Sequence, residues 1–177
     1  MNIFESTFEK HKKLMLESLI EKEIPNGKYY HVDDVTLNRI FRGKNIGKKM
    51  YQILLTCMPN DTIGLLSTTG DRLSTASNVS SIYKSLGGNI GIKGSKDIYD
   101  VVFLKNFNKV KLYYSEPKSN ELIHRESIDG DEFIFKMRKY PNPIIIDVYS
   151  KNLNTMIGMI SATKISWDSK TEDFDFD

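Results

Sequence analysis

The chain has 177 residues, of which 40% are apolar, so it is long enough to bury the core of one compact domain. Its formal net charge is only +2, and nothing in the overall charge requires a nucleic-acid or anionic-membrane partner. The single cysteine, Cys57, excludes an internal disulfide, and no cysteine–histidine spacing indicates a zinc site. Because the chain lacks a signal-peptide pattern and an apolar run near the ~20 residues that span a bilayer, we expect a soluble, cytoplasmic protein.

In chain order, apolar residues at helical intervals first predict an amphipathic helix over residues 4–23. β-favouring side chains then predict a strand over residues 29–41, which leads directly into a glycine-containing turn. Residues 47–58 place their apolar side chains on one helical face, and residues 62–68 are typical of a short buried strand. A further helix is expected over residues 77–86, where a Gly-Gly pair ends it.

The last part of the chain is richer in strand patterns, beginning with a strand over residues 97–104. An Asp-Gly turn signal between residues 122–128 and 132–137 predicts a β-hairpin, and a second strand pair is expected over residues 144–149 and 156–165. The acidic segment 171–177 is expected to fray.

These elements predict an α+β fold similar to an α/β sandwich. Its sheet would be mixed and mostly antiparallel, flanked by helices, with β-hairpins added in the C-terminal part. We expect residues 1–108 to form the core and residues 109–177 to form a hairpin extension that packs on it and ends in an acidic tail.

The turn at residues 42–48 has the composition of a phosphate-binding element. A diphosphate needs several donors in a small volume, and a helix N-terminus offers unpaired N–H groups with a favourable dipole. Gly43 and Gly47 allow close approach, and Asn45 is the non-glycine residue that best tolerates left-handed geometry. Arg42, Lys44, Lys48 and Lys49 add positive charge.

The sequence Arg-Gly-Lys-Asn-Ile-Gly at residues 42–47 resembles the Arg/Gln-x-x-Gly-x-Gly/Ala signature of the GCN5-related N-acetyltransferase superfamily. Asn45 stands where the family usually has its middle glycine. Residues 81–88 are similar to the family's helix ending Leu-Tyr-x-x-Leu-Gly-Phe, and Tyr83 falls where many members place a tyrosine that protonates the leaving thiolate.

The resemblance implies a core at residues 1–108 that binds acetyl-CoA as co-substrate. The residues expected to hold the diphosphate are Arg42, Gly43, Lys44, Asn45, Ile46, Gly47 and Lys48. In this family the strand before the turn also splays from its neighbour, and its free backbone groups bind the pantetheine arm and polarise the thioester carbonyl. By alignment these groups would belong to Leu37, Asn38, Arg39 and Ile40.

The attacking amine must lose a proton, and His31, Asp33 and Asp34 are the candidates to accept it. Strand alternation places His31 and Asp33 on the same face. The other histidines, including His124, have no partner in the sequence that suggests catalysis and are expected at the surface, whereas Cys57 is expected in the core.

The predicted activity is transfer of an acetyl group from acetyl-CoA to an amine, on either a protein or a small molecule, by direct attack. The alternative is an inactive binding protein of the same fold, such as a phage or mobile-element effector that acts on a host protein. We expect neither a nucleic-acid nor a membrane partner.

The family usually has two or three strands before the strand that feeds the turn, whereas one helix is expected here. These strands come either from the C-terminal hairpins, which we favour, or from the partner in a homodimer.

Overall fold

The structure is a computed structural model that describes residues 25–59, 61–68, 85–86, 88–93, 100–104, 123–168, 170 and 173–176. The helix expected over residues 4–23 and the catalytic candidate Tyr83 lie outside these ranges, as does most of the helix expected over residues 77–86.

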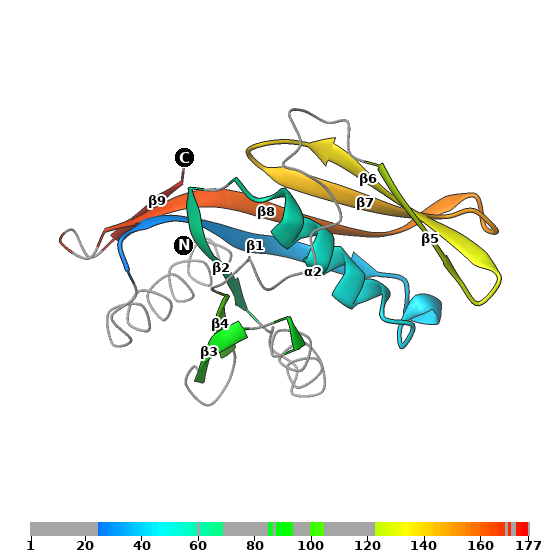
Figure 1. Cartoon of the computed structure of the whole chain (residues 1–177), viewed down its shortest axis with the longest axis horizontal. Coiled ribbons are helices and arrows are strands. Elements are labelled where there is room, and N and C mark those ends of the chain that lie inside the picture. The colour runs from blue at the N-terminus through cyan, green and yellow to red at the C-terminus, as the bar shows by residue number, and fades with distance from the viewer. Residues whose placement is uncertain are drawn as a thin grey trace, which may run out of the picture.

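The described residues form one sheet of nine strands (Figure 1). Eight of them follow the order β3-β4-β2-β1-β8-β7-β6-β5, and β9 pairs with β8. Among the pairings, only that of β1 with β2 is parallel. The strands are β1 (Gly27–Leu37), β2 (Thr62–Thr68), β3 (Gly88–Lys93), β4 (Asp100–Leu104), β5 (Ile123–Ile128), β6 (Asp131–Lys139), β7 (Ile144–Ser150), β8 (Thr155–Asp168) and β9 (Asp173–Phe176).

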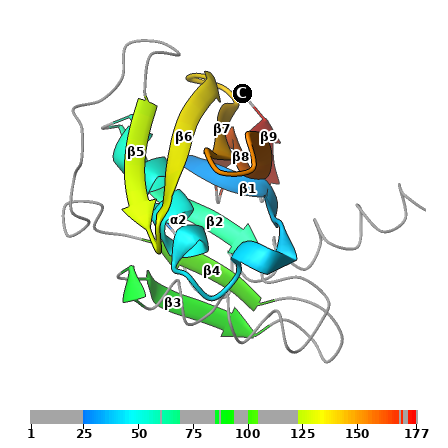
Figure 2. The ribbon, with the colours of Figure 1, turned by 90° about the vertical axis from the view of Figure 1, so that its right-hand side faces the viewer.

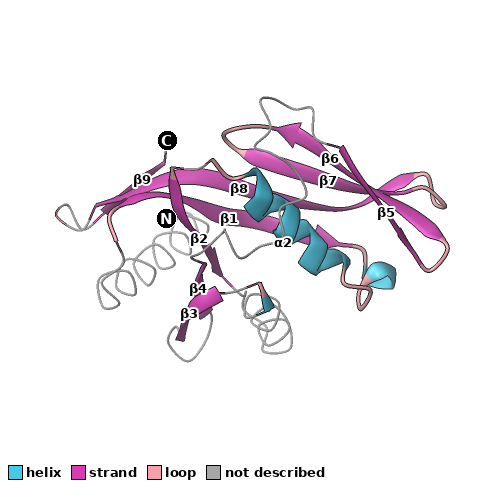
Figure 3. Cartoon of the chain, in the orientation of Figure 1, coloured by secondary structure: helices cyan, strands magenta, loops and turns pink. Residues whose placement is uncertain are grey.

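The mixed, mostly antiparallel sheet was predicted correctly, but the helical layers of a sandwich are not seen in the described part. There, strands dominate, and the helices are α2 (Ile46–Cys57), the short 3-10 helix η1 (Arg39–Phe41) and one further helical residue, Ser85 (Figure 3). The sheet curls around α2 like a half-barrel (Figure 2).

The core lies between α2 and the concave face of this sheet. From Met50 to Cys57, α2 is buried on nearly all sides, with only Gln52 partly exposed, and Phe133 and Phe135 of β6 belong to the same cluster. Cys57 is fully buried, as expected, and burial raises the pKa of its thiol to about 12. The buried apolar residues of α2 are Ile46, Met50, Tyr51, Ile53, Leu54, Leu55 and Cys57.

The C-terminal strands lie directly beside β1, on the side away from β2. The antiparallel pairing of β8 with β1 runs from Gly27 opposite Trp167 to Leu37 opposite Gly158. Strands β7, β6 and β5 continue the sheet outward from β8. The second half of the chain therefore supplies the sheet on this side of β1.

Three differences from the predictions affect the fold most. Strand β1 ends at Leu37, because the side chain of Asn38 accepts a hydrogen bond from the Ile40 N–H and starts η1. Gly88, expected to stop a helix, opens β3. The C-terminal segment was expected to fray, yet β9 pairs with β8 as an added strand.

Candidate functional site

The parallel strands β1 and β2 separate at His31. Their pairing runs only from Lys28 opposite Thr62 to His31 opposite Leu66. Beyond this point β1 continues to Leu37, while the end of β2 pairs with β4. Among the described residues, no strand pairs with residues 32–37 on the side that β2 has left. The backbone N–H and C=O groups on that edge are therefore open to hydrogen bonds with water or with an extended ligand.

A β-bulge at Asp33 marks the place where the strands separate. On β8, Val32 lies opposite Ala162 and Asp34 lies opposite Ser161, so Asp33 is one extra residue in β1. Such a bulge bends its strand and increases the local twist. The bulge therefore accounts for the divergence of β1 from β2 just after their last paired residues.

His31, Asp33 and Thr163 form a hydrogen-bonded chain at the bulge. The Nδ1 atom of His31 lies 3.1 Å from Oδ1 of Asp33, and the Thr163 hydroxyl donates to Oδ2 of the same carboxylate. The His31 side chain is 14% exposed and that of Asp33 is 37% exposed. This arrangement confirms that His31 and Asp33 share a face, and Asp34 is exposed beside them.

The predicted phosphate-binding turn has the expected backbone. Gly43 has a φ of 85°, and Asn45 is left-handed with φ 63° and ψ 15°. A methyl group added at Gly43 would meet no atom within 4 Å, so the backbone angle and not space calls for glycine here.

Helix α2 begins immediately after this turn with an uncapped N-terminus. Asn45 makes no side-chain cap hydrogen bond, and the first helical bond joins the Lys49 N–H to the Asn45 carbonyl. No described residue accepts a hydrogen bond from the N–H of Ile46, Gly47 or Lys48. The Ile46 side chain is buried, so this residue would contribute only its main chain.

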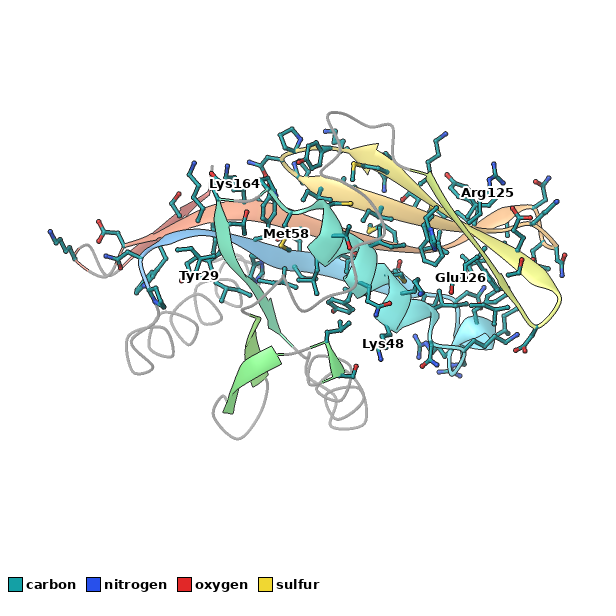
Figure 4. All side chains as sticks on the ribbon, viewed as in Figure 1. Tyr29, Lys48, Met58, Arg125, Glu126 and Lys164 are labelled. Carbon is teal, nitrogen blue, oxygen red and sulfur yellow. The ribbon has the colours of Figure 1, made fainter. Side chains whose placement is uncertain are left out.

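The charged side chains of the turn have different partners. The Arg42 Nε donates to the Leu37 carbonyl over 3.4 Å, and the side chain is exposed. The Lys44 Nζ lies 4.0 Å from Oδ2 of Asp129 and 6.0 Å from the centre of the Phe41 ring. Lys48 projects from the first turn of α2 away from β5 (Figure 4).

The unpaired edge of β1 lies earlier in the chain than predicted, at residues 32–37 and not at residues 37–40. The Asn38 N–H donates to the Ile157 carbonyl over 2.7 Å, and the Ile40 N–H is taken by the Asn38 side chain. Arg39 belongs to η1, where its carbonyl accepts from the Arg42 N–H. Of the predicted residues, only Leu37 belongs to the segment 32–37 that β2 leaves unpaired.

His124 is not the surface residue that was expected. Its side chain is 16% exposed, and its Nε2 lies 3.1 Å from Oε2 of Glu126. The Lys49 Nζ lies 3.3 Å from the same oxygen. Sequence reasoning missed this cluster because it joins α2 to β5, two elements far apart in the chain.

Other kinds of site find no support within the described ranges. They contain no group of three or more side chains that could hold a metal ion, and no helix long and apolar enough to cross a membrane. Comparison with known proteins finds no matching family model, no matching curated protein and no matching solved structure.

Proposed function

We propose that the protein binds acetyl-CoA and transfers its acetyl group to an amine. The observation that carries this proposal is the combination of a forked parallel strand pair with a basic, left-handed turn at the end of the longer strand. The signature at residues 42–47 and the splayed strand are the two features that the resemblance to the N-acetyltransferases implies. Here they occur in one continuous segment, from β1 to the first turn of α2.

The turn supplies what a diphosphate requires. The N–H groups of Ile46, Gly47 and Lys48 point out of the helix start, where the helix dipole favours negative charge. Arg42 and Lys44 lie in the preceding turn, and Lys48 projects from the helix beside it. A diphosphate placed there meets main-chain donors and at least two cationic side chains.

The unpaired edge of β1 is suited to an extended pantetheine arm. At ~3.3 Å per residue, a strand from residue 32 to residue 37 spans roughly 17 Å. An arm with amide groups can hydrogen-bond along this edge as an added strand would. The thioester would then lie near the bulge, beside His31 and Asp33.

In the proposed reaction the amine nitrogen attacks the thioester carbon, and the carbon–sulfur bond breaks as the amide forms. His31 is the proposed acceptor of the proton that the amine loses, and Asp33 holds the imidazole through Nδ1. Nε2, the atom left to act as the base, is buried, so the amine would reach it only through the opening between β1 and β2. The departing thiolate needs a proton, and Tyr83, which lies outside the described residues, remains the proposed donor.

The position of the C-terminal strands also supports this function. In the N-acetyltransferases the strands before the turn build one wall of the acceptor site. In this chain β8, β7, β6 and β5 extend the sheet from the corresponding side of β1. The acceptor wall can therefore come from the second half of the chain, without a partner subunit.

The proposal is tested by the effect of acetyl-CoA on the melting temperature. A ligand that prefers the folded state raises Tm, and at about 100 times its Kd it adds roughly 2.7 kcal/mol. Arg42→Glu and Gly47→Glu should each abolish the rise, because they place negative charge at the diphosphate. Lys170→Glu, a charge reversal at another exposed residue, is the matched control and should keep it.

Turnover separates an enzyme from an inactive binding protein. With a panel of amines, release of free CoA thiol would support acetyl transfer. Binding of acetyl-CoA without thiol release from any amine would support the alternative, in which the fold is retained as a binding protein. Failure of millimolar acetyl-CoA to raise Tm would rule out both forms of the proposal.

A further inference from the structure

The hairpin of β5 and β6 places two carboxylates against Lys44 of the phosphate-binding turn and Lys49, which follows the turn in α2. Glu126 on β5 contacts Lys49, which lies two residues after Gly47 in α2. Asp129, in the turn between β5 and β6, lies near Lys44. Figure 4 shows Glu126 on the side of β5 that faces the start of α2, and Arg125 on the opposite side. Both lysines thus already have a counter-ion from a distant part of the chain.

We propose that the Glu126 carboxylate competes with the ligand for Lys49. It pairs with this lysine until a polyanionic ligand binds at the anion site and displaces the carboxylate. This inference rests on the proposed function, because it assumes that the diphosphate binds at residues 42–48. The hairpin would then influence the affinity of the anion site for its ligand, because only a ligand that attracts Lys49 more strongly than one carboxylate can replace Glu126.

Distance and solvent exposure indicate that the ion pair of Glu126 is stronger than that of Asp129. Glu126 lies 3.3 Å from Lys49, and their side chains are 31% and 16% exposed, so solvent screens this pair only in part. Asp129 lies 4.0 Å from Lys44 and is 72% exposed, so water and salt weaken its attraction. Glu126 is therefore the main competitor, and Asp129 contributes less.

His124 fixes the position of Glu126. Its Nε2 contacts the same carboxylate oxygen that Lys49 contacts, and its ring packs against Phe135 with the centroids 5.8 Å apart. The carboxylate is thereby held toward α2 from its own strand. His124 acts through Glu126, as a positioning residue.

The experiment measures the Kd of CoA by calorimetry for the wild type, Glu126→Gln, Asp129→Asn and Glu132→Gln. Glu126→Gln should tighten binding about two- to fivefold, the range expected for release of one partly exposed ion pair, and Asp129→Asn should tighten it less. Glu132→Gln is the control, because Glu132 forms its ion pairs with Arg125 and Lys151, which lie outside the turn. Its Kd should equal that of the wild type.

A double variant tests whether Lys49 mediates the effect. If the release of this lysine causes the gain, Lys49→Gln should remove the benefit of Glu126→Gln. The proposed displacement of Glu126 would be wrong if Lys49→Gln/Glu126→Gln bound CoA more tightly than Lys49→Gln by the full factor. It would also be wrong if Glu126→Gln alone left the Kd of CoA unchanged or raised it. Failure of every folded variant to bind CoA would instead reject the proposed function, and this inference with it.

Discussion

His31 and Asp33 are two positions apart in β1, and their side chains meet with Nδ1 of the imidazole 3.1 Å from Oδ1 of the carboxylate. A bulge at Asp33 brings them together, and the Thr163 hydroxyl on the neighbouring strand holds the carboxylate from its other oxygen. The pair lies where β1 and β2 separate. A carboxylate-oriented imidazole beside the separation of two strands is an arrangement suited to proton transfer.

His31→Gln and Asp33→Asn should slow acetyl transfer while leaving the binding of acetyl-CoA unchanged. A positioned general base contributes about 10²- to 10⁴-fold to rate, so His31→Gln should lower kcat by at least ~10²-fold. Asp33→Asn should cost less, because it removes only the group that orients the imidazole. Steady-state kinetics with a reactive amine, together with Kd by calorimetry, give both quantities.

Thr163→Val is the graded control for this pair. It removes one hydrogen bond to Asp33 and keeps the side-chain volume, so we expect a loss of kcat smaller than that of Asp33→Asn. A His31→Gln variant with wild-type kcat at every pH would remove His31 from the mechanism. The base would then have to be sought elsewhere, with Asp34 the next candidate.

Gly43 and Asn45 should respond in opposite ways to small substitutions, although both have a positive φ. Gly43→Ala meets no steric contact but forces alanine to a φ of 85°, which should cost on the order of 1 kcal/mol. Asn45→Gly relieves a left-handed residue and widens the space beside the phosphates. Urea unfolding and the Kd of CoA should show weaker stability and binding for Gly43→Ala only.

Sequence patterns predicted the elements whose structure depends on residues close together in the chain. The apolar spacing of α2 and the Asp-Gly turn between β5 and β6 each carry their signal within about ten residues, and both elements lie where expected. The pairing of β8 with β1 carries no such signal, because it joins segments from opposite ends of the chain. Sequence reasoning did not predict this pairing; it offered only, as one of two alternatives, that the C-terminal hairpins supply the missing strands.

The candidate site shows the same division. Glycine and asparagine preferences predicted the left-handed turn, and strand alternation predicted a common face for His31 and Asp33. The bulge that determines where β1 leaves β2 depends on register with β8, which no local pattern specifies. The contact of Glu126 with Lys49 depends on how the sheet curls around α2, so it too was invisible.

Gly158 should be intolerant of alanine because β1 and β8 approach closely there. A Cβ at this position would lie 2.6 Å from the Thr36 carbonyl oxygen and 3.1 Å from Cδ1 of Leu37, so the strands would have to move apart. Overpacking of this kind typically costs about 1–3 kcal/mol. Thermal unfolding should show the loss for Gly158→Ala, whereas Ser161→Ala on the same strand should change Tm little.

The same substitution should also weaken CoA binding. Gly158 lies opposite Leu37, the last residue of the unpaired edge, so a displaced β1 would carry the edge and the following turn with it. A destabilised Gly158→Ala variant that keeps the wild-type Kd would show that the turn does not depend on the end of β1.

Asp131 should make stability fall in acid. The Ser150 hydroxyl donates to its carboxylate over 2.6 Å and the Asn152 N–H donates over 3.0 Å, and these hydrogen bonds hold the pKa of Asp131 below its usual value. Because the folded pKa is the lower one, the added stability is complete above the unfolded value of about 4. It is lost as the pH falls through the folded pKa, when the carboxylate takes up a proton.

Asp131→Asn should therefore lower Tm at neutral pH and flatten its dependence on pH below about 4. Tm measured from pH 7 to pH 3 tests this, with Asp129→Asn as the control, because Asp129 is exposed in the adjacent turn. Ser150→Ala should reproduce part of the loss, since it removes the shortest of the hydrogen bonds to Asp131. An acid limb equally steep in Asp131→Asn and the wild type would assign the acid sensitivity to other carboxylates, beginning with Glu132, whose pKa the hydrogen bond from Arg125 lowers.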